Sequence, residues 1–340
     1  MQYEITKHQT LFNDKGYVHM IGWAKKLVLQ YDRDDSKAFK FQIRERDGYF
    51  IYSENCAMHL AVGKYGSKAV VSASIVDFEK GVFHYASIKK RLPNDKLRMP
   101  LSSENGDVTY TDKRVGMKFS KASNARFIKC EFIDFYDGKT LYVNLTLSEH
   151  TKDTLVNVIP FENKKSAFLY KQFAPDMTVS GIVRCGGDEY YFSDENSYAL
   201  LNWSRCSLPK CKEHFSIYTS GIHKNVNFAI TLNNSIGDDR RGSQNGAFVA
   251  GELVKLGYVK IDHSKTSRML EKPWYISDDE GKLDLVFSPI ITTRTNSAMS
   301  VEMDDRTIVY GTISGNIFDG NKLNLSLNDF PAALEITRFI

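Results

Sequence analysis

Short stretches in which apolar and polar residues alternate recur along the chain, and they limit strongly which folds it can adopt. In such a stretch the apolar side chains share one face of an extended strand, so that face can be buried while the other meets water. Turns that suit hairpins, such as Asp137-Gly138, lie between these stretches. Many short strands joined by hairpins predict an all-β fold of barrels or sandwiches. The clearest stretches are residues 39–44, 126–135, 141–147 and 322–327.

Helical periodicity is scarce. Residues 194–201 follow Ser193, which can cap a helix N-terminus, and residues 329–338 place apolar side chains at helical spacing near the end of the sequence. We therefore predict short helices at these two places and strands elsewhere.

An internal repeat divides the chain into two related parts. Residues 177–183 (MTVSGIV) recur 134 residues later as residues 311–317 (GTISGNI), and in both copies a glycine turn, a strand and an Ala-Leu pair follow. A looser echo lies upstream, where Asp137-Gly138-Lys139 and Glu280-Gly281-Lys282 each precede a predicted strand. Matches in the same order along the chain indicate two similar β units. We predict one barrel in residues 1–197 and a second in residues 198–340.

Composition and charge exclude several classes of protein. The chain has 340 residues with 45 basic and 41 acidic side chains, so a net charge of +4 is spread too evenly to predict a nucleic-acid partner. The longest stretch without a charged residue is thirteen residues, shorter than the roughly 18 that a membrane span needs. Phosphate-loop, dinucleotide and zinc motifs are absent, so we expect no cofactor and no metal. The sequence carries no signal for an oligomeric state.

The five cysteines and the N-terminus bear on the compartment. An odd number of cysteines without a C-x-x-C motif favours free thiols in a reducing environment. The first residues have no apolar core of the kind that a signal peptide needs. We therefore expect a cytoplasmic protein.

Three segments, residues 201–206 (LNWSRC), 244–248 (QNGAF) and 272–274 (KPW), together resemble a bacterial family known as domain of unknown function 2804, which is related to the lipocalin-like (calycin) two-barrel proteins. Residues 201–206 (LNWSRC) are similar to the family string Leu-Asp-Trp-Gly-Arg-Gly, and residues 244–248 (QNGAF) to a string that begins Glu-Asn. Residues 272–274 (KPW) look like the start of a third. The resemblance implies two tandem lipocalin-like antiparallel β-barrels with few short helices. Its more distant relatives include carotenoid hydratases and cofactor-free cyclases.

This chain departs from the family strings at two carboxylates. Asn202 stands where the family has Asp, and Gln244 stands where it has Glu. Amides cannot move protons as carboxylates do, so these changes weigh against catalysis. We assign no catalytic residue, although His214, His223, Asp238, Asp239 and Glu252 are the titratable groups nearest these strings.

The segment around Trp203 is the first candidate binding site. Trp203 and Arg205 are two residues apart, so on a strand they face the same side, where indole and guanidinium can stack. They line a ligand pocket in one interpretation and close the end of a barrel in the other.

The second candidate is a row of amides in residues 225–234. Asn227 and Asn233 share one face of a predicted strand, where they bind a polar ligand or face solvent. Asn245 lies in a glycine-rich loop that turn geometry explains equally well, and Trp274 is a ligand contact or a core anchor. The ligand-binding candidates are Asn202, Trp203, Arg205, Asn227, Asn233, Asn245 and Trp274.

Three functions fit this sequence. The leading one is binding of an apolar or amphipathic small molecule in a β-barrel cavity. The alternatives are a cofactor-independent hydratase, isomerase or cyclase acting on an isoprenoid- or lipid-like substrate, and a carbohydrate-binding or carbohydrate-processing β protein. An enclosed apolar pocket favours the first two, and an open groove with exposed Trp favours the third. A buried carboxylate or histidine aimed into a cavity distinguishes the enzyme from the binder.

Overall fold

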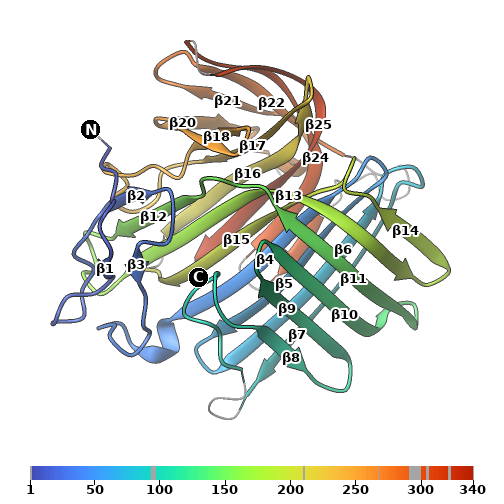
Figure 1. The fold of residues 1–340 in the computed structure, drawn as a ribbon, viewed down its shortest axis with the longest axis horizontal. Coiled ribbons are helices and arrows are strands. Elements are labelled where there is room, and N and C mark those ends of the chain that lie inside the picture. The colour runs from blue at the N-terminus through green and yellow to red at the C-terminus, as the bar shows by residue number, and fades with distance from the viewer. Residues whose placement is uncertain are drawn as a thin grey trace.

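The protein folds into two antiparallel β-sheets, each strongly curled into a half-barrel (Figure 1). The computed structural model describes residues 2–92, 97–209, 211–266, 268–290, 300–303, 306–320 and 323–339. Within these residues there is no α-helix, and the helical turns are the 3-10 turns η1 (Lys40–Gln42) and η2 (Met269–Glu271). The predicted all-β class with two barrel-like units is confirmed.

The first sheet contains the strands up to Ser207. Its strands are β2 (Gly22–Ala24), β4 (Arg44–Tyr52), β5 (Cys56–Tyr65), β6 (Lys68–Asp77), β7 (Val82–Arg91), β8 (Val108–Thr111), β9 (Val115–Ala122), β10 (Ala125–Tyr136), β11 (Lys139–Glu149), β12 (Leu155–Pro160), β13 (Phe168–Cys185), β14 (Asp188–Phe192) and β15 (Tyr198–Ser207). The order across the sheet is β7-β6-β5-β4-β15-β13-β11-β10-β9-β8, with β12 and β14 on β13 and β2 on β12. The short strands β1 (Gln9–Thr10) and β3 (Leu29–Gln30) form a separate parallel pair.

The second sheet begins at Cys211. Its strands are β16 (Cys211–His223), β17 (Val226–Asn233), β18 (Gly246–Val249), β19 (Glu252–Lys255), β20 (Val259–Asp262), β21 (Trp274–Asp278), β22 (Leu283–Pro289), β23 (Ser300–Met303), β24 (Arg306–Asp319) and β25 (Leu323–Phe339). The order is β19-β18-β17-β16-β25-β24-β22-β21-β20, with β23 on β24. In Figure 1 this sheet lies above the first one, in yellow to red.

The repeat seen in the sequence has a structural cause. Gly181 in β13 pairs with Leu145 of β11, and Gly315 in β24 pairs with Leu285 of β22. Both glycines have positive φ, +132° and +122°, and a Cβ at either one would collide with a backbone carbonyl of the paired strand. The repeated Ser-Gly therefore marks the same close approach of two strands in each half-barrel.

Strand pairing moves the change of unit downstream of the predicted boundary at residue 197. β15 is hydrogen-bonded between β13 and β4, so residues 198–207 belong to the first sheet, and the second begins at Cys211. The repeat compares blocks of sequence and carries no information on which strands pair. A boundary placed from it therefore assigns β15, which completes the first sheet, to the second unit.

Three local predictions were wrong. Residues 198–201 and 329–338, predicted as helical, lie in β15 and β25, because pairing with long neighbouring strands outweighs the weak helical periodicity. Residues 39–43, predicted as a strand, form η1 and its flanks, and the strand begins at Arg44. Phe39 and Phe41 are consequently exposed instead of facing a core.

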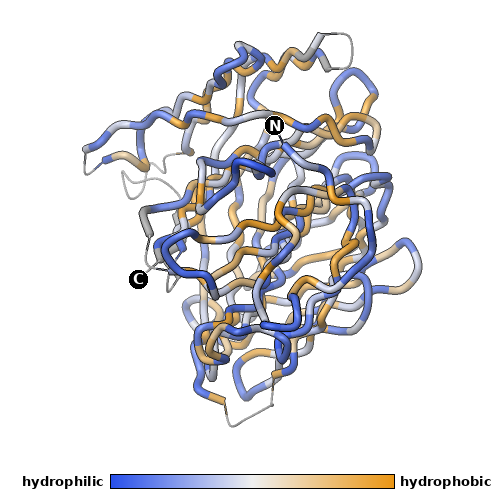
Figure 2. Tube along the Cα trace, turned by 90° about the vertical axis from the view of Figure 1, so that its left-hand side faces the viewer, coloured by the Kyte–Doolittle hydropathy of each residue, from blue (hydrophilic) through white to orange (hydrophobic). Residues whose placement is uncertain are grey.

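Side chains fill the inside of each half-barrel and the space between the two sheets. Alternate residues of a strand face opposite sides, so β15 sends Leu201 and Trp203 into the first core and Leu200 toward the second sheet. Figure 2 shows the resulting mixture of apolar and polar segments along the trace. Between the sheets the apolar contacts include Phe50, Phe173 and Tyr310.

The described helical turns are too short to cross a membrane. Cys56, Cys130, Cys185 and Cys206 are buried and not joined in disulfides, and the side chain of Cys211 lies outside the described residues. The cytoplasmic location stays a prediction.

Candidate functional site

The predicted segment around Trp203 lies on β15, in the middle of the first sheet, and its side chains serve two different regions. Trp203 and Arg205 face the interior of the first half-barrel, whereas Asn202 faces the second sheet.

Trp203 and Arg205 form a buried bracket. The guanidinium carbon of Arg205 lies 4.3 Å from the centre of the Trp203 ring, and its Nη1 donates to Oδ1 of Asp47 at 2.8 Å. Its Nη2 donates to the carbonyl oxygen of Pro100 at 2.8 Å, which fixes the loop above it. Trp203 packs edge-on against the ring of Tyr170, 5.3 Å away. This geometry matches the closing-bracket interpretation.

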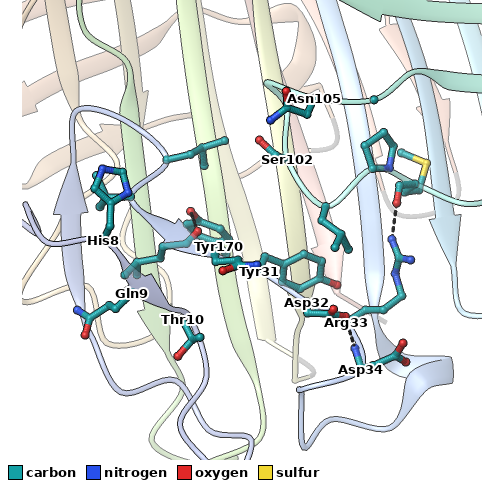
Figure 3. Close-up of a pocket in the computed structure, with 18 of the residues that line it drawn as sticks. His8, Gln9, Thr10, Tyr31, Asp32, Arg33, Asp34, Ser102, Asn105 and Tyr170 are labelled. Carbon is teal, nitrogen blue, oxygen red and sulfur yellow. Dashed lines mark hydrogen bonds between the residues drawn. The ribbon is translucent and has the colours of Figure 1, made fainter.

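Above this bracket lies a cavity of about 950 Å³, which we call the mouth pocket (Figure 3). Figure 3 shows Tyr31 and Tyr170 between the segment that carries His8 and the loop that carries Ser102. The apolar part of its lining consists of Leu27, Val28, Leu29, Met99, Pro100 and Leu101. Charged side chains, among them Arg33 and Asp34, lie at one end. Uncharged polar residues, among them Gln30, Ser102 and Asn105, complete the lining, so the pocket offers an apolar wall, polar groups and an ionic end.

The polar groups beneath the mouth pocket bond to one another. The Tyr31 hydroxyl donates to Oε1 of Glu45 at 3.2 Å, and Nε of Arg33 donates to the same oxygen at 3.0 Å. The Tyr170 hydroxyl donates to the carbonyl oxygen of Leu29 at 2.7 Å. Burial raises the pKa of Tyr31 above its ordinary value, and so does the Glu45 charge. Both phenols therefore remain neutral donors to the protein and hold the floor in place.

A second buried polar region lies between the two sheets, and we call it the junction cluster. Its members come from β4, β5, β13 and β15 on one side and from β16, β17, β24, β25 and the loop after β17 on the other. They are Arg46, His59, Lys171, Asn202, His214, Tyr218, Asn233, Gln244, Arg306 and Glu335. The side chains of this cluster are polar, in contrast to the apolar contacts around Phe173.

Glu335 is the carboxylate at the centre of the junction cluster. It forms an ion pair with Arg306, and Nδ2 of Asn202 donates to its Oε2 at 3.4 Å. Nη2 of Arg46 is 4.0 Å from the same oxygen and 2.8 Å from Nε2 of His59. Burial alone would raise the pKa of Glu335, but Arg306, Arg46 and Lys171 together lower it well below its ordinary value. The carboxylate therefore stays ionised at neutral pH.

Lys171 is a buried amine beside neutral partners. Its Nζ lies 3.2 Å from the Tyr218 hydroxyl and 3.3 Å from Oδ1 of Asn233. Burial lowers its pKa to about 8, against the opposing effect of Glu335. Burial also lowers the pKa of His214 to about 3, so that imidazole is neutral. At neutral pH an amine near its pKa thus lies close to a fixed carboxylate.

A void of about 30 Å³ opens among these side chains, lined by Lys171, Asn202, His214, Gln244 and Glu335 together with their neighbours. This volume can hold a water molecule, and the lining supplies polar partners for it. The amide of Gln244 is 3% exposed, and neither its oxygen nor its nitrogen has a hydrogen-bond partner in the described part of the protein. An unpaired buried amide at a polar void indicates that a water or a polar ligand group completes it.

The sequence matches the family described as "Domain of unknown function (DUF2804)" over residues 2–338. The chain belongs to the DUF2804 family. A solved structure described as an AttH from Nitrosomonas europaea is similar to this DUF2804 protein, with a TM-score of 0.60 and 11% identity over 92% of this chain and 97% of that one. Kievitone hydratase from Nectria haematococca is also similar, with a TM-score of 0.51 and 11% identity over 86% of this chain and 88% of that one. At these identities the likeness shows the fold alone. No curated protein sequence matches the chain.

The other predicted residues of this DUF2804 protein are distributed between the cluster and structural positions. Asn233 belongs to the junction cluster, and Asn245 supports it by accepting the backbone N–H of Asn233 at 2.6 Å and donating to Gly257. Asn227 donates instead to Asp176 at 2.8 Å, at another place between the sheets. Trp274 lies in the second core, and its Nε1 donates to the carbonyl of Met269.

Most of the charged residues of the junction cluster were missed by sequence reasoning. They lie on strands far apart in the chain and follow no motif spacing. A usable signal was the single charge inside an apolar strand, as with Glu335 between Leu334 and Ile336, or Lys171 beside Tyr170. The helix predicted over residues 329–338 concealed the first of these.

Proposed function

We propose that this DUF2804 protein binds an amphipathic small molecule in the mouth pocket. The observation that carries the proposal is a cavity of about 950 Å³ with an apolar wall and an ionic end at Arg33 and Asp34. Its volume lies within the range of about 300–1,000 Å³ that is typical of small-molecule sites, and its lining combines the apolar residues with polar ones such as Gln30 and Asn105. The apolar part of the ligand contacts Leu29 and Leu101, and its polar end lies near Arg33. Trp203 and Arg205 support the floor rather than contact the ligand.

Native mass spectrometry of the freshly purified protein tests this proposal. We expect a retained small molecule, or uptake of an anilinonaphthalene sulfonate added as a probe. Leu101→Arg places a charge on the apolar wall and should abolish uptake, whereas Ile133→Arg changes a similarly exposed residue of β10 and should leave it intact. Uptake by a folded Leu101→Arg variant equal to that of the unchanged protein would refute the proposal.

A specific observation favours a second candidate function, cofactor-independent proton transfer of the hydratase type at the junction cluster. A buried carboxylate, Glu335, and a buried histidine, His214, line the void there. These are the groups that distinguish an enzyme from a binder. One protein of similar fold is named as a hydratase, which is consistent with this candidate.

The chemistry of hydration assigns roles to the cluster residues. Addition of water to a double bond delivers a proton to one atom and hydroxide to its neighbour, so it needs an acid and a base. Glu335, whose pKa Arg306 lowers, is too weak a base to take a proton near neutral pH, so its role is to orient the water in the void by accepting a hydrogen bond from it. Lys171, with its pKa lowered to about 8 by burial, carries both proton transfers: its amine form accepts a proton from the water, and its ammonium form delivers one to the double bond through the Tyr218 hydroxyl. A substrate needs more room than the void provides, so side chains such as Leu208 must move for it to enter.

Deuterium exchange separates this second candidate from simple binding. The molecule retained by the protein is incubated with it in D₂O, and carbon-bound deuterium is measured by mass spectrometry. We expect exchange with the unchanged protein and none with Glu335→Gln. Glu213→Gln, which alters a half-exposed glutamate on the same sheet, is the matched control. Equal exchange in both variants would exclude a role for Glu335 in positioning the water.

A further inference from the structure

Two exposed aromatic rings stand at one end of the first half-barrel. Phe39 and Phe41 are 69% and 71% exposed, and their rings stack with centres 5.5 Å apart and planes 17° apart. Phe39 directly precedes η1 and Phe41 lies within it, and β4 follows. Exposing two neighbouring Phe rings gives up the free energy that burial would provide, so their position calls for a partner.

Basic side chains line a cavity beside Phe41. Beside η1 lies a second cavity of about 740 Å³, which we call the basic pocket and to which Phe41 contributes. Its charged lining consists of Arg33, Lys40, Lys64, Lys68 and Arg98, against the carboxylates Asp34 and Glu45. Ion pairs join Lys40 to Asp34 at 2.6 Å and Arg33 to Glu45 at 3.0 Å. The lining therefore carries an excess of positive charge beside the exposed rings.

We propose that η1 and the rim of the basic pocket dock on a lipid bilayer that contains anionic lipids. Phe39 and Phe41 insert at the boundary between headgroups and acyl chains, and the lysines and arginines of the basic pocket meet the headgroup phosphates and carboxylates. Exposed apolar side chains beside a basic surface are an arrangement that binds anionic membrane surfaces. A lipid surface is fluid, so it can also accommodate an exposed pair of rings without a preformed pocket.

The proposal is independent of the function proposed for the mouth pocket. The two cavities share Arg33, Asp34 and Arg98, so docking places the mouth pocket close to the bilayer, where amphipathic molecules concentrate. Vesicle binding and ligand retention are nevertheless separate measurements, and either can fail without the other.

Co-sedimentation with vesicles tests the aromatic part of the surface. The full chain is mixed with vesicles of phosphatidylcholine alone or of phosphatidylcholine with phosphatidylserine. We expect binding to the phosphatidylserine vesicles, with at least a tenfold loss in the double variant Phe39→Ser, Phe41→Ser. Tyr191→Ser is the matched control, because Tyr191 is 73% exposed on β14, and it should bind normally. Circular dichroism checks that each variant is folded.

The charged part is tested separately. Lys68→Glu should weaken binding to phosphatidylserine vesicles about fivefold or more, and added salt should weaken binding of the unchanged protein. Lys129→Glu, at an exposed lysine of β10, should have no such effect. Absence of binding to the anionic vesicles, equal binding to both kinds of vesicle, or equal losses in the Tyr191 and Lys129 controls would each overturn the proposal.

Discussion

A buried cation of the first polar region, Arg205, and one of the second, Lys171, differ in their partners. Arg205, inside the first half-barrel, donates to the carboxylate of Asp47 at 2.8 Å and stacks on Trp203. Lys171, between the sheets, is bonded to the neutral groups of Tyr218 and Asn233. A directly paired ion stabilises one geometry, whereas a buried amine without such a partner has a lowered pKa and can exchange a proton near neutral pH. The first region therefore has a structural role, and the second is suited to chemistry.

Breaking the pair in the first region has the largest expected effect. Asp47→Ala leaves the fully buried guanidinium of Arg205 without its nearest carboxylate, and we expect a loss of about 3–5 kcal/mol in the free energy of unfolding. Asp188→Ala removes the exposed ion pair with Lys80 and should cost at most about 1 kcal/mol. Urea unfolding measures both. Similar losses in the two variants would contradict the structural role of the bracket.

Loss of Lys171 from the junction cluster should have the opposite effect on stability. The pKa of Lys171 is lowered from 10.5 in the unfolded chain to about 8, so between those values the unfolded state binds more protons and stability rises with pH. The full penalty applies below pH 8 and amounts to about 3 kcal/mol. Lys171→Met should therefore unfold at higher urea concentration at pH 7 and lose this rise between pH 8 and 10.5. A variant less stable than the unchanged protein at pH 7 would show that the amine is structural.

A histidine sharpens the comparison on the acid side. Burial lowers the pKa of His214 from 6.5 to about 3. Between these two pH values the unfolded state therefore binds a proton at this histidine and the folded state does not. Stability is full above pH 6.5 and falls as the pH decreases, by about 2 kcal/mol at pH 5. His214→Gln should flatten the dependence of unfolding free energy on pH between 4 and 6.5, with His150→Gln, at an exposed histidine, as control. An unchanged slope would mean that another group, such as His59, causes the acid sensitivity.

The half-barrels could be predicted from the sequence because the alternation that marks a strand is local. The repeat was visible in the sequence because Gly181 and Gly315 both lie where a paired strand comes too close for a Cβ. Sequence reasoning failed for residues 39–43, where alternation looked like a strand although no neighbouring strand pairs with it. The junction cluster could not be predicted as a site, because Lys171 and Glu335 meet only through the packing of one sheet on the other. Asn202 was found through its family string, which does not reveal that its side chain faces the second sheet.

The smallest expected change in stability concerns Gln244. Its amide is buried without a hydrogen-bond partner in the described residues, so Gln244→Met removes an unsatisfied polar group and keeps a similar shape. We expect the free energy of unfolding to stay within about 1 kcal/mol of the original value or to rise slightly. If the amide instead completes the shell of a water used in chemistry, deuterium exchange into the retained molecule should fall while stability holds. A stable protein that has lost exchange would show that the void is functional and not a packing defect. A destabilised Gln244→Met variant would instead indicate that a tightly held water already satisfies the amide.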